Sequence, residues 1–146
     1  MLLRTIAGVS LALTVVLFVC CETALWLLPV AFAGSYLVLL LLAFAILWLF
    51  SVAVDMESPQ EEDSKLYRRV MHLYIEALIS LVGLKVETAG LEKTPKEGRF
   101  LLVCNHLFLA DPALILNAFP KAQLAFVTKQ ENMKMFVVGP IMHKIL

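Results

Sequence analysis

Two long apolar runs fill the first third of the chain. Residues 5–27 are interrupted by one charge, Glu22, and residues 36–54 carry none. A helix needs about 20 apolar residues to cross the hydrocarbon core of a bilayer, and both runs are close to that length. Pro29 and the pair Gly34–Ser35 indicate a turn between the runs. The pattern therefore predicts two membrane-inserted segments that form a hairpin, either spanning or re-entrant.

The charges around this hairpin predict its orientation. Arg4 precedes the first run, and Lys65, Arg68 and Arg69 follow the second. Basic residues favour the cytoplasmic side, so both ends of the hairpin are expected there. Glu22 lies near the predicted turn, where a carboxylate can reach headgroups or water. The alternative for Glu22 is a functional carboxylate inside the membrane.

Residues 64–84 repeat apolar side chains at helical spacing, which predicts an amphipathic helix that stops at Gly83. The apolar stripe of this helix either packs on a domain core or lies on the membrane. The opposite face is expected to expose Arg68 and His72 to solvent.

Three segments further along have the pattern of β-strands. Residues 84–88 alternate, residues 100–104 (FLLVC) form an apolar run typical of a strand buried on both faces, and residues 122–128 resemble a third strand. Between the last two, Asp111 is expected to cap a helix that begins at Pro112 and runs to about Ala118. Strand, helix and strand in this order predict a βαβ unit.

The expected fold class is therefore α/β, with a two-segment transmembrane hairpin followed by an incomplete, mainly parallel α/β domain. The expected divisions are a membrane anchor over residues 1–54, an acidic linker over residues 55–63 and the polar domain over residues 64–146.

Composition supports this division. The chain is 61% hydrophobic and 16% charged, whereas soluble domains have about 45–50% apolar and about 25% charged residues. The linker DMESPQEED is acidic, and the polar domain carries eleven bases and six acids. That excess either attracts anionic headgroups or is ordinary surface variation. Three cysteines, two of them within an apolar run, favour a reducing compartment over a disulfide framework.

The loop after residues 100–104 holds the candidate chemistry. It places His106 at the carboxyl end of a predicted strand and Asp111 five residues later, at a predicted helix start. A histidine that takes a hydroxyl proton needs a group that fixes its tautomer and stabilises the imidazolium, and a carboxylate can do both. The residues alone also allow a simpler interpretation, in which Asp111 only caps its helix and His106 only fills a loop.

Longer stretches around this loop resemble the glycerolipid acyltransferases typified by 1-acylglycerol-3-phosphate acyltransferase. The first motif of that family is N-H-x4-D after a hydrophobic strand, which Asn105, His106 and Asp111 match. The flanking matches lie in LVGLKVETAGLEK and AFVTKQENMKMFVVGP, at Gly83, Val86, Glu87, Gly90, Lys129, Glu131, Phe136 and Gly139.

The resemblance implies an O-acyltransferase of phospholipid biosynthesis at the cell membrane, with its domain on the cytoplasmic side. His106 would be the general base for the free hydroxyl of a lysophospholipid such as 1-acylglycerol-3-phosphate, and Asp111 would hold the imidazole. The acyl donor would be acyl-CoA or acyl carrier protein. No cofactor, metal or nucleic acid is expected. Lys129 is a candidate phosphate contact, with a solvated or structural lysine as the alternative.

Two departures from the family pattern stand out. Phe108 occupies the position two residues after the histidine, where the family usually has serine. An arginine-bearing phosphate motif and an E-G-T-R-like loop are expected after Gly139 and are missing up to Leu146. The chain is accordingly expected to be the N-terminal part of an enzyme, inactive alone. The competing hypothesis is a truncated, non-enzymatic membrane protein that binds lipid or a partner through its basic domain.

Overall fold

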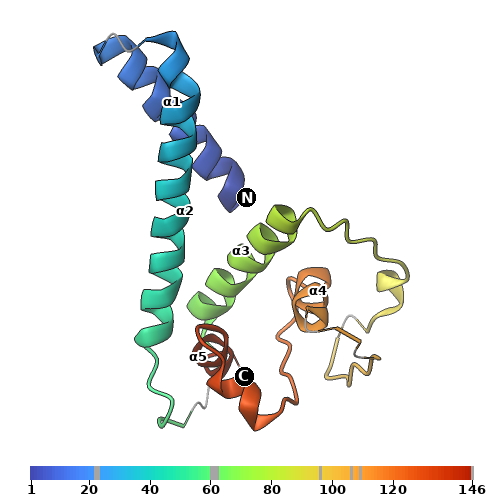
Figure 1. Cartoon of the computed structure of the whole chain (residues 1–146). Coiled ribbons are helices and arrows are strands. Elements are labelled where there is room, and N and C mark those ends of the chain that lie inside the picture. The colour runs from blue at the N-terminus through green and yellow to red at the C-terminus, as the bar shows by residue number, and fades with distance from the viewer. Residues whose placement is uncertain (22–23, 60–62, 96, 106, 109, 146) are drawn as a thin grey trace.

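The structure is a computed structural model, and it describes residues 1–21, 24–59, 63–95, 97–105, 107–108 and 110–145. Figure 1 shows a long helical pair that rises from a smaller domain of short helices and loops. The elements, in chain order, are α1 (Leu2–Cys21), η1 (Leu25–Leu27), α2 (Leu28–Val52), α3 (Lys65–Val82), η2 (Leu91–Lys93), α4 (Asp111–Ala118), η3 (Gln130–Lys134) and α5 (Val138–His143), where η marks a 3-10 helix.

The two predicted apolar helices are present, and they lie against each other as an antiparallel pair (Figure 1). Their mean hydropathy is 2.2 for α1 and 2.6 for the η1–α2 segment, and only 17% and 0% of these apolar stretches, respectively, are buried within the protein. The core helix of a soluble protein would be buried, so length, composition and exposure together indicate membrane association. Small polar residues mark the contact face of α1, where Ser10 is fully buried and the Thr14 hydroxyl donates to the Ser10 carbonyl at 2.8 Å.

The predicted turn between the helices was misplaced. Pro29 lies in the first turn of α2, and Gly34 and Ser35 are inside that helix. Proline suits a first helical turn because the amide hydrogen that it lacks has no partner there. The Ser35 hydroxyl donates to the carbonyl of Phe32 at 3.0 Å, so this polar side chain has a hydrogen-bond partner within its own helix. The connection therefore precedes Leu25, and Glu22 lies outside the described residues.

The third predicted helix is confirmed, with both of its ends. Ser64 caps α3 by accepting from the amide of Tyr67, and Gly83 ends it in the left-handed conformation, at a φ of 72°. The Tyr67 hydroxyl donates to the Phe50 carbonyl at 3.1 Å, and the Tyr74 hydroxyl donates to the Ala43 carbonyl. Two contacts in opposite chain order show that α3 runs antiparallel along the second half of α2.

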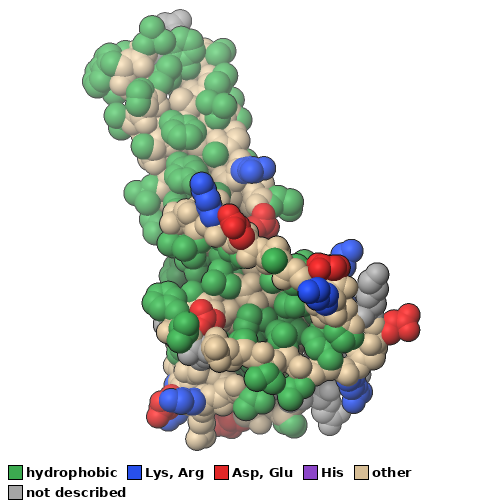
Figure 2. Space-filling model, turned by 90° about the vertical axis from the view of Figure 1, so that its right-hand side faces the viewer, with side chains coloured by type: hydrophobic (Ala, Val, Ile, Leu, Met, Phe, Trp, Pro, Cys, Tyr) green, Lys and Arg blue, Asp and Glu red, His purple; other side chains and the backbone are tan. Residues whose placement is uncertain are grey.

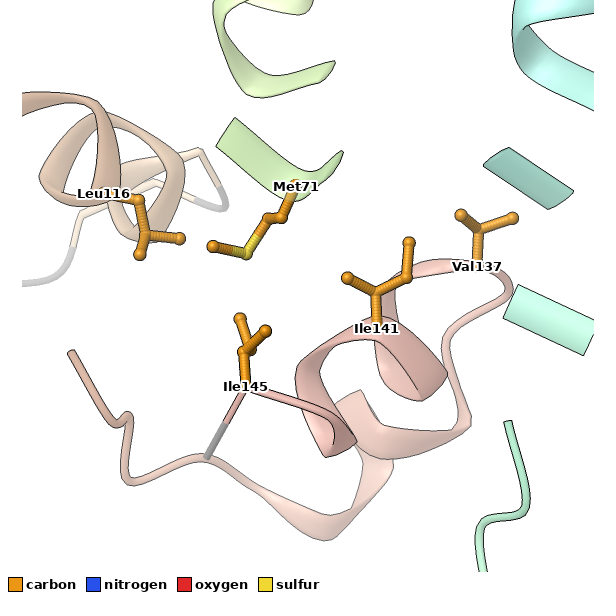
Figure 3. Packing of buried hydrophobic residues seen from close by; sticks show 5 residues of the cluster. All are labelled: Met71, Leu116, Val137, Ile141 and Ile145. Carbon is orange, nitrogen blue, oxygen red and sulfur yellow. The ribbon is translucent and has the colours of Figure 1, made fainter. Parts of the chain in front are cut away.

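The core of the domain is small and joins three parts of the chain. Met71 of α3 and Leu116 of α4 meet three residues of the C-terminal segment, Val137, Ile141 and Ile145 (Figure 3). The apolar stripe of α3 therefore packs partly on this core, while several of its apolar residues remain exposed at the helix's C-terminal end.

Arg68 corrects the predicted polar face of α3. Its side chain and that of Asp63 are only 10% and 12% exposed, and Nη2 lies 2.7 Å from the Asp63 carboxylate. The same nitrogen donates to the Ile145 carbonyl at 2.8 Å and to the Leu124 carbonyl at 3.4 Å. The arginine thus ties the end of the acidic linker to two distant segments, a role that helical periodicity alone does not reveal.

The predicted α/β fold class is wrong, because the described residues contain helices and no β-strand. The three predicted strands lie in segments 84–90, 99–105 and 123–129, which Figure 1 shows as separate irregular connections. Leu101 and Val103 are 85% and 79% exposed, where burial on both faces was predicted. A strand needs ladder hydrogen bonds to a neighbouring segment, and apolar patterning alone does not provide that neighbour.

Candidate functional site

The candidate loop connects segment 99–105 to α4. The structure describes Asn105, Leu107, Phe108 and Ala110 of this loop, whereas His106 and Leu109 lie outside the described residues.

Asp111 fixes the backbone of this loop. Its Oδ2 accepts from the amides of Leu107 at 2.8 Å and Phe108 at 2.9 Å. The amide of Asp111 in turn donates to the Phe108 carbonyl at 3.0 Å, which closes a compact turn. The carboxylate thus holds the two residues that follow His106 in the sequence.

This arrangement changes the predicted capping role of Asp111. Ala110 is the N-cap of α4, and Asp111 is its first residue, followed by Pro112 in the first turn. The predicted end of this helix at Ala118 is confirmed. A carboxylate in the first turn is favoured by the helix dipole, so Asp111 stabilises both the helix start and the loop before it.

The loop presents large apolar side chains at its surface. Leu107 is 91% exposed and Phe108, which stands at the family's usual serine position, is 69% exposed. Beside them an apolar groove of about 150 Å³ lies between the end of α3 and the start of α4. Its lining residues are Leu78, Ile79, Val82, Leu84, Phe108, Ala110, Ala113 and Leu114. The groove therefore reaches the candidate loop from the side of α3.

Lys129 lies in another part of the domain, immediately before η3. Its side chain is exposed, and no ion-pair partner is found for its ammonium among the residues that the structure describes. η3 packs against α5, whereas α4 packs against α3. Lys129 and Asp111 thus belong to different helix pairs of the domain.

Two titratable groups of α3, His72 and Tyr74, have clearly shifted pKa values. Burial, and then the positive charge of Arg68, lower the pKa of His72 from its ordinary value of 6.5. Its Nε2 is buried without a hydrogen-bond partner in the described structure. Burial also raises the pKa of Tyr74. The expectation that His72 is an ordinary solvated residue is therefore wrong.

The described residues contain no group of three or more His, Cys, Asp or Glu side chains that could hold a metal ion. The ionisable candidates in the described part of the loop region reduce to the Asp111 carboxylate.

Sequence reasoning missed two features of this region. It did not foresee that Asp111 accepts from the loop amides, although aspartate often binds backbone amides nearby in sequence. It also missed the groove, because the lining residues come from segments up to 36 positions apart, from Leu78 to Leu114. The sequence did contain a signal for an apolar surface, because Leu81, Val82 and Leu84 are close together at the predicted end of the helix. Several apolar residues gathered at one place can form a contact surface.

Comparison with known proteins finds a family match in the C-terminal part of the chain. Residues 85–146 match a family model described as Acyltransferase, and the matched range includes His106, Asp111 and Lys129. No curated protein and no solved structure matches the chain significantly. The match confirms the resemblance that the N-H-x4-D loop and its flanking residues indicated.

Proposed function

We propose that this chain, whose residues 85–146 match an Acyltransferase family model, contributes to an enzyme of phospholipid biosynthesis that transfers an acyl group to a lysophospholipid. The acceptor is the free hydroxyl of a lipid such as 1-acylglycerol-3-phosphate, and the donor is the thioester of acyl-CoA or acyl carrier protein. The observation that carries the proposal is the family match across a loop that Asp111 ties down at the residues after His106.

His106 acts as the general base in this proposal. Its imidazole removes the proton from the acceptor hydroxyl while the oxygen attacks the thioester carbonyl. The tetrahedral intermediate then collapses, the carbon–sulfur bond breaks, and the thiolate leaves with the proton that the imidazolium returns. The products are the new ester and the free thiol, so the histidine ends in its starting state.

Asp111 supports this cycle in two ways. Its hydrogen bonds to the amides of Leu107 and Phe108 fix the loop that carries His106. Its negative charge also stabilises the imidazolium that forms during proton transfer. Pre-positioning of the base before the substrate arrives is a large part of what an enzyme contributes to such a reaction.

The surroundings of the loop favour a lipid substrate. The groove beside Phe108 is lined only by apolar side chains and suits part of an acyl chain. The long apolar helices α1 and α2 favour a membrane location for the domain, and a membrane is where both the acceptor and the product reside. Arg4 and the basic residues of α3 favour the cytoplasmic side of the cell membrane for the domain.

Lys129 completes the proposal as a contact for the acceptor phosphate. Its exposed ammonium has no competing ion pair in the described structure, so it is available to an anionic group. Lysine binds phosphate as a point charge and tolerates several geometries.

The test is an acyl-transfer assay on the full-length protein in lipid vesicles. We expect thioester consumption to depend on a lysophospholipid acceptor and to disappear in His106→Ala. His143→Ala is the control, since His143 contacts the carbonyl of Ser58 and lies away from the candidate loop. Acceptor binding without turnover in the unaltered protein would instead favour the non-enzymatic, lipid-binding hypothesis.

A further inference from the structure

We propose that the C-terminal end of α3 and the neighbouring Phe108 form a second membrane contact, which rests the domain on the lipid surface beside the hairpin. The residues of this contact, here called the α3 patch, are Leu78, Leu81, Val82, Leu84 and Phe108. Four of these residues also line the groove that we propose for an acyl chain, but the inference concerns docking of the domain and not the transfer step.

The α3 patch is apolar and exposed. Leu81 is 61% exposed and Val82 is 63% exposed, and the other three members are also exposed. They are contiguous, since Leu78, Val82, Leu84 and Phe108 line one groove. A contiguous apolar surface of this kind marks a place where a soluble surface meets a partner or a membrane. Figure 2 shows hydrophobic side chains gathered on the face of the domain that it presents, with charged groups around them.

The position of the α3 patch selects a membrane. The N-terminal amine of Met1 lies 2.6 Å from Oε1 of Glu76, so the start of α1 is held against α3 just before the patch begins. The apolar run of α1 begins at Thr5, about 6 Å further along a helix that rises 1.5 Å per residue. In Figure 1 the C-terminal end of α3 lies close to the N-terminus, at the edge of the domain from which α1 and α2 extend.

Charge at this edge supports the same partner. Arg4 on α1 and Lys85, just after α3, are both exposed beside the apolar residues. Basic side chains that flank an apolar surface match the headgroup layer, where they meet lipid phosphates while the apolar groups enter the acyl boundary. A protein partner at this edge would have to fit between the domain and the bilayer that holds α1 and α2. The partner that fits is therefore the lipid surface itself.

The experiment measures lipid contact at single positions of the full-length protein in vesicles. Cys20, Cys21 and Cys104 are replaced by serine, and one cysteine at a time is introduced by Leu81→Cys, Phe108→Cys or Val127→Cys. Each variant carries an environment-sensitive fluorophore, and the vesicles contain lipids with a nitroxide near the headgroup. Val127 is the matched control, because it is a fully exposed apolar residue in segment 123–129, which Figure 1 shows descending from α4 towards α5, away from the C-terminal end of α3.

We expect quenching at positions 81 and 108 to exceed quenching at position 127 at least several-fold. Equal, weak quenching at all three positions would overturn the proposal, since the patch would then face water. Equal, strong quenching would also overturn it, because the contact would then involve the whole domain. Protection at position 81 that appears in detergent and grows with protein concentration would identify a second copy of the chain as the partner, and would equally overturn it.

Discussion

The helical pair α1–α2 and the extended segments of the domain have similarly apolar sequences and different structures. The first form long helices, while residues 99–105 and 123–129 remain irregular in the described structure. A helix closes its backbone hydrogen bonds within one segment, so a long apolar run is enough to specify it where no water competes. An extended segment depends on a neighbour that its own sequence does not encode.

The largest expected difference between these regions lies in hydrogen exchange. In vesicles, amides of α1 and α2 should exchange at least about 10³-fold more slowly than amides of residues 100–105 and 124–128. Only the amides of α1 and α2 are hydrogen-bonded within a helix that lipid shields from water. Mass-spectrometric exchange of the full-length protein measures both regions in one experiment. Protection of residues 100–105 comparable to that of α2 would show a paired strand, and the described fold would then be wrong.

The next largest effect concerns the arginine that connects the domain to its linker. Arg68→Ala should destabilise the domain by about 3–5 kcal/mol, because it leaves the Asp63 carboxylate, which is only 12% exposed, and two carbonyls without their donor. Arg69→Ala, one residue away and exposed, should change stability by less than about 0.5 kcal/mol. Denaturant unfolding followed by near-UV circular dichroism distinguishes the two. Equal effects would mean that the Arg68 contacts contribute little.

Two glycines should respond to alanine with opposite signs. A Cβ at Gly139 would lie 2.0 Å from the Met133 carbonyl oxygen, so Gly139→Ala should cost about 1–3 kcal/mol as η3 and α5 separate. A Cβ at Gly34 meets nothing within 4 Å, and Gly34→Ala should stabilise α2 by about 0.5–1 kcal/mol. Thermal unfolding of both variants checks the signs. A neutral Gly139→Ala would contradict the close approach of η3 to α5.

The smallest expected effect is a pH dependence of the domain's free energy of unfolding. The pKa of His72 is lowered in the folded state, so below about pH 6.5 the unfolded chain binds a proton that the native protein does not. Stability from this group is fully present above that pH and decreases as the pH falls towards the folded-state pKa. His72→Gln should flatten the stability profile between pH 7 and 5, whereas His143→Gln serves as the comparison. An unchanged profile in His72→Gln would contradict the burial of this imidazole.

These differences explain how much of the fold the sequence predicts. The helices α1, α2, α3 and α4 follow from run length, periodicity and end signals such as Gly83. The strand predictions at residues 84–88, 100–104 and 122–128 failed because they assumed mutual pairing. Arg68 was misplaced for a related reason, since its partners near Leu124 and Ile145 are distant in sequence.

The candidate site also has a part that the sequence indicates and a part that it does not. The motif residues Asn105, His106 and Asp111 were recognisable from local spacing, and the family match includes them. The groove from α3 to Phe108 was not, because it exists only when α3 and α4 pack together. The motif is thus recognisable from the chain, whereas the surfaces that surround it require the fold.

The central claim is that Asp111 supports catalysis at His106 as well as the loop structure, and Asp111→Asn tests it most directly. Both loop amides donate to Oδ2, and the amide oxygen of asparagine can accept the same two bonds while removing the charge. The rate of acyl transfer by the full-length protein in vesicles should fall by several orders of magnitude, about 10⁴-fold if imidazolium stabilisation is lost as in other histidine–carboxylate pairs, with an unchanged melting temperature. A rate within a few-fold of the unaltered protein would contradict the account and leave Asp111 with a purely structural role.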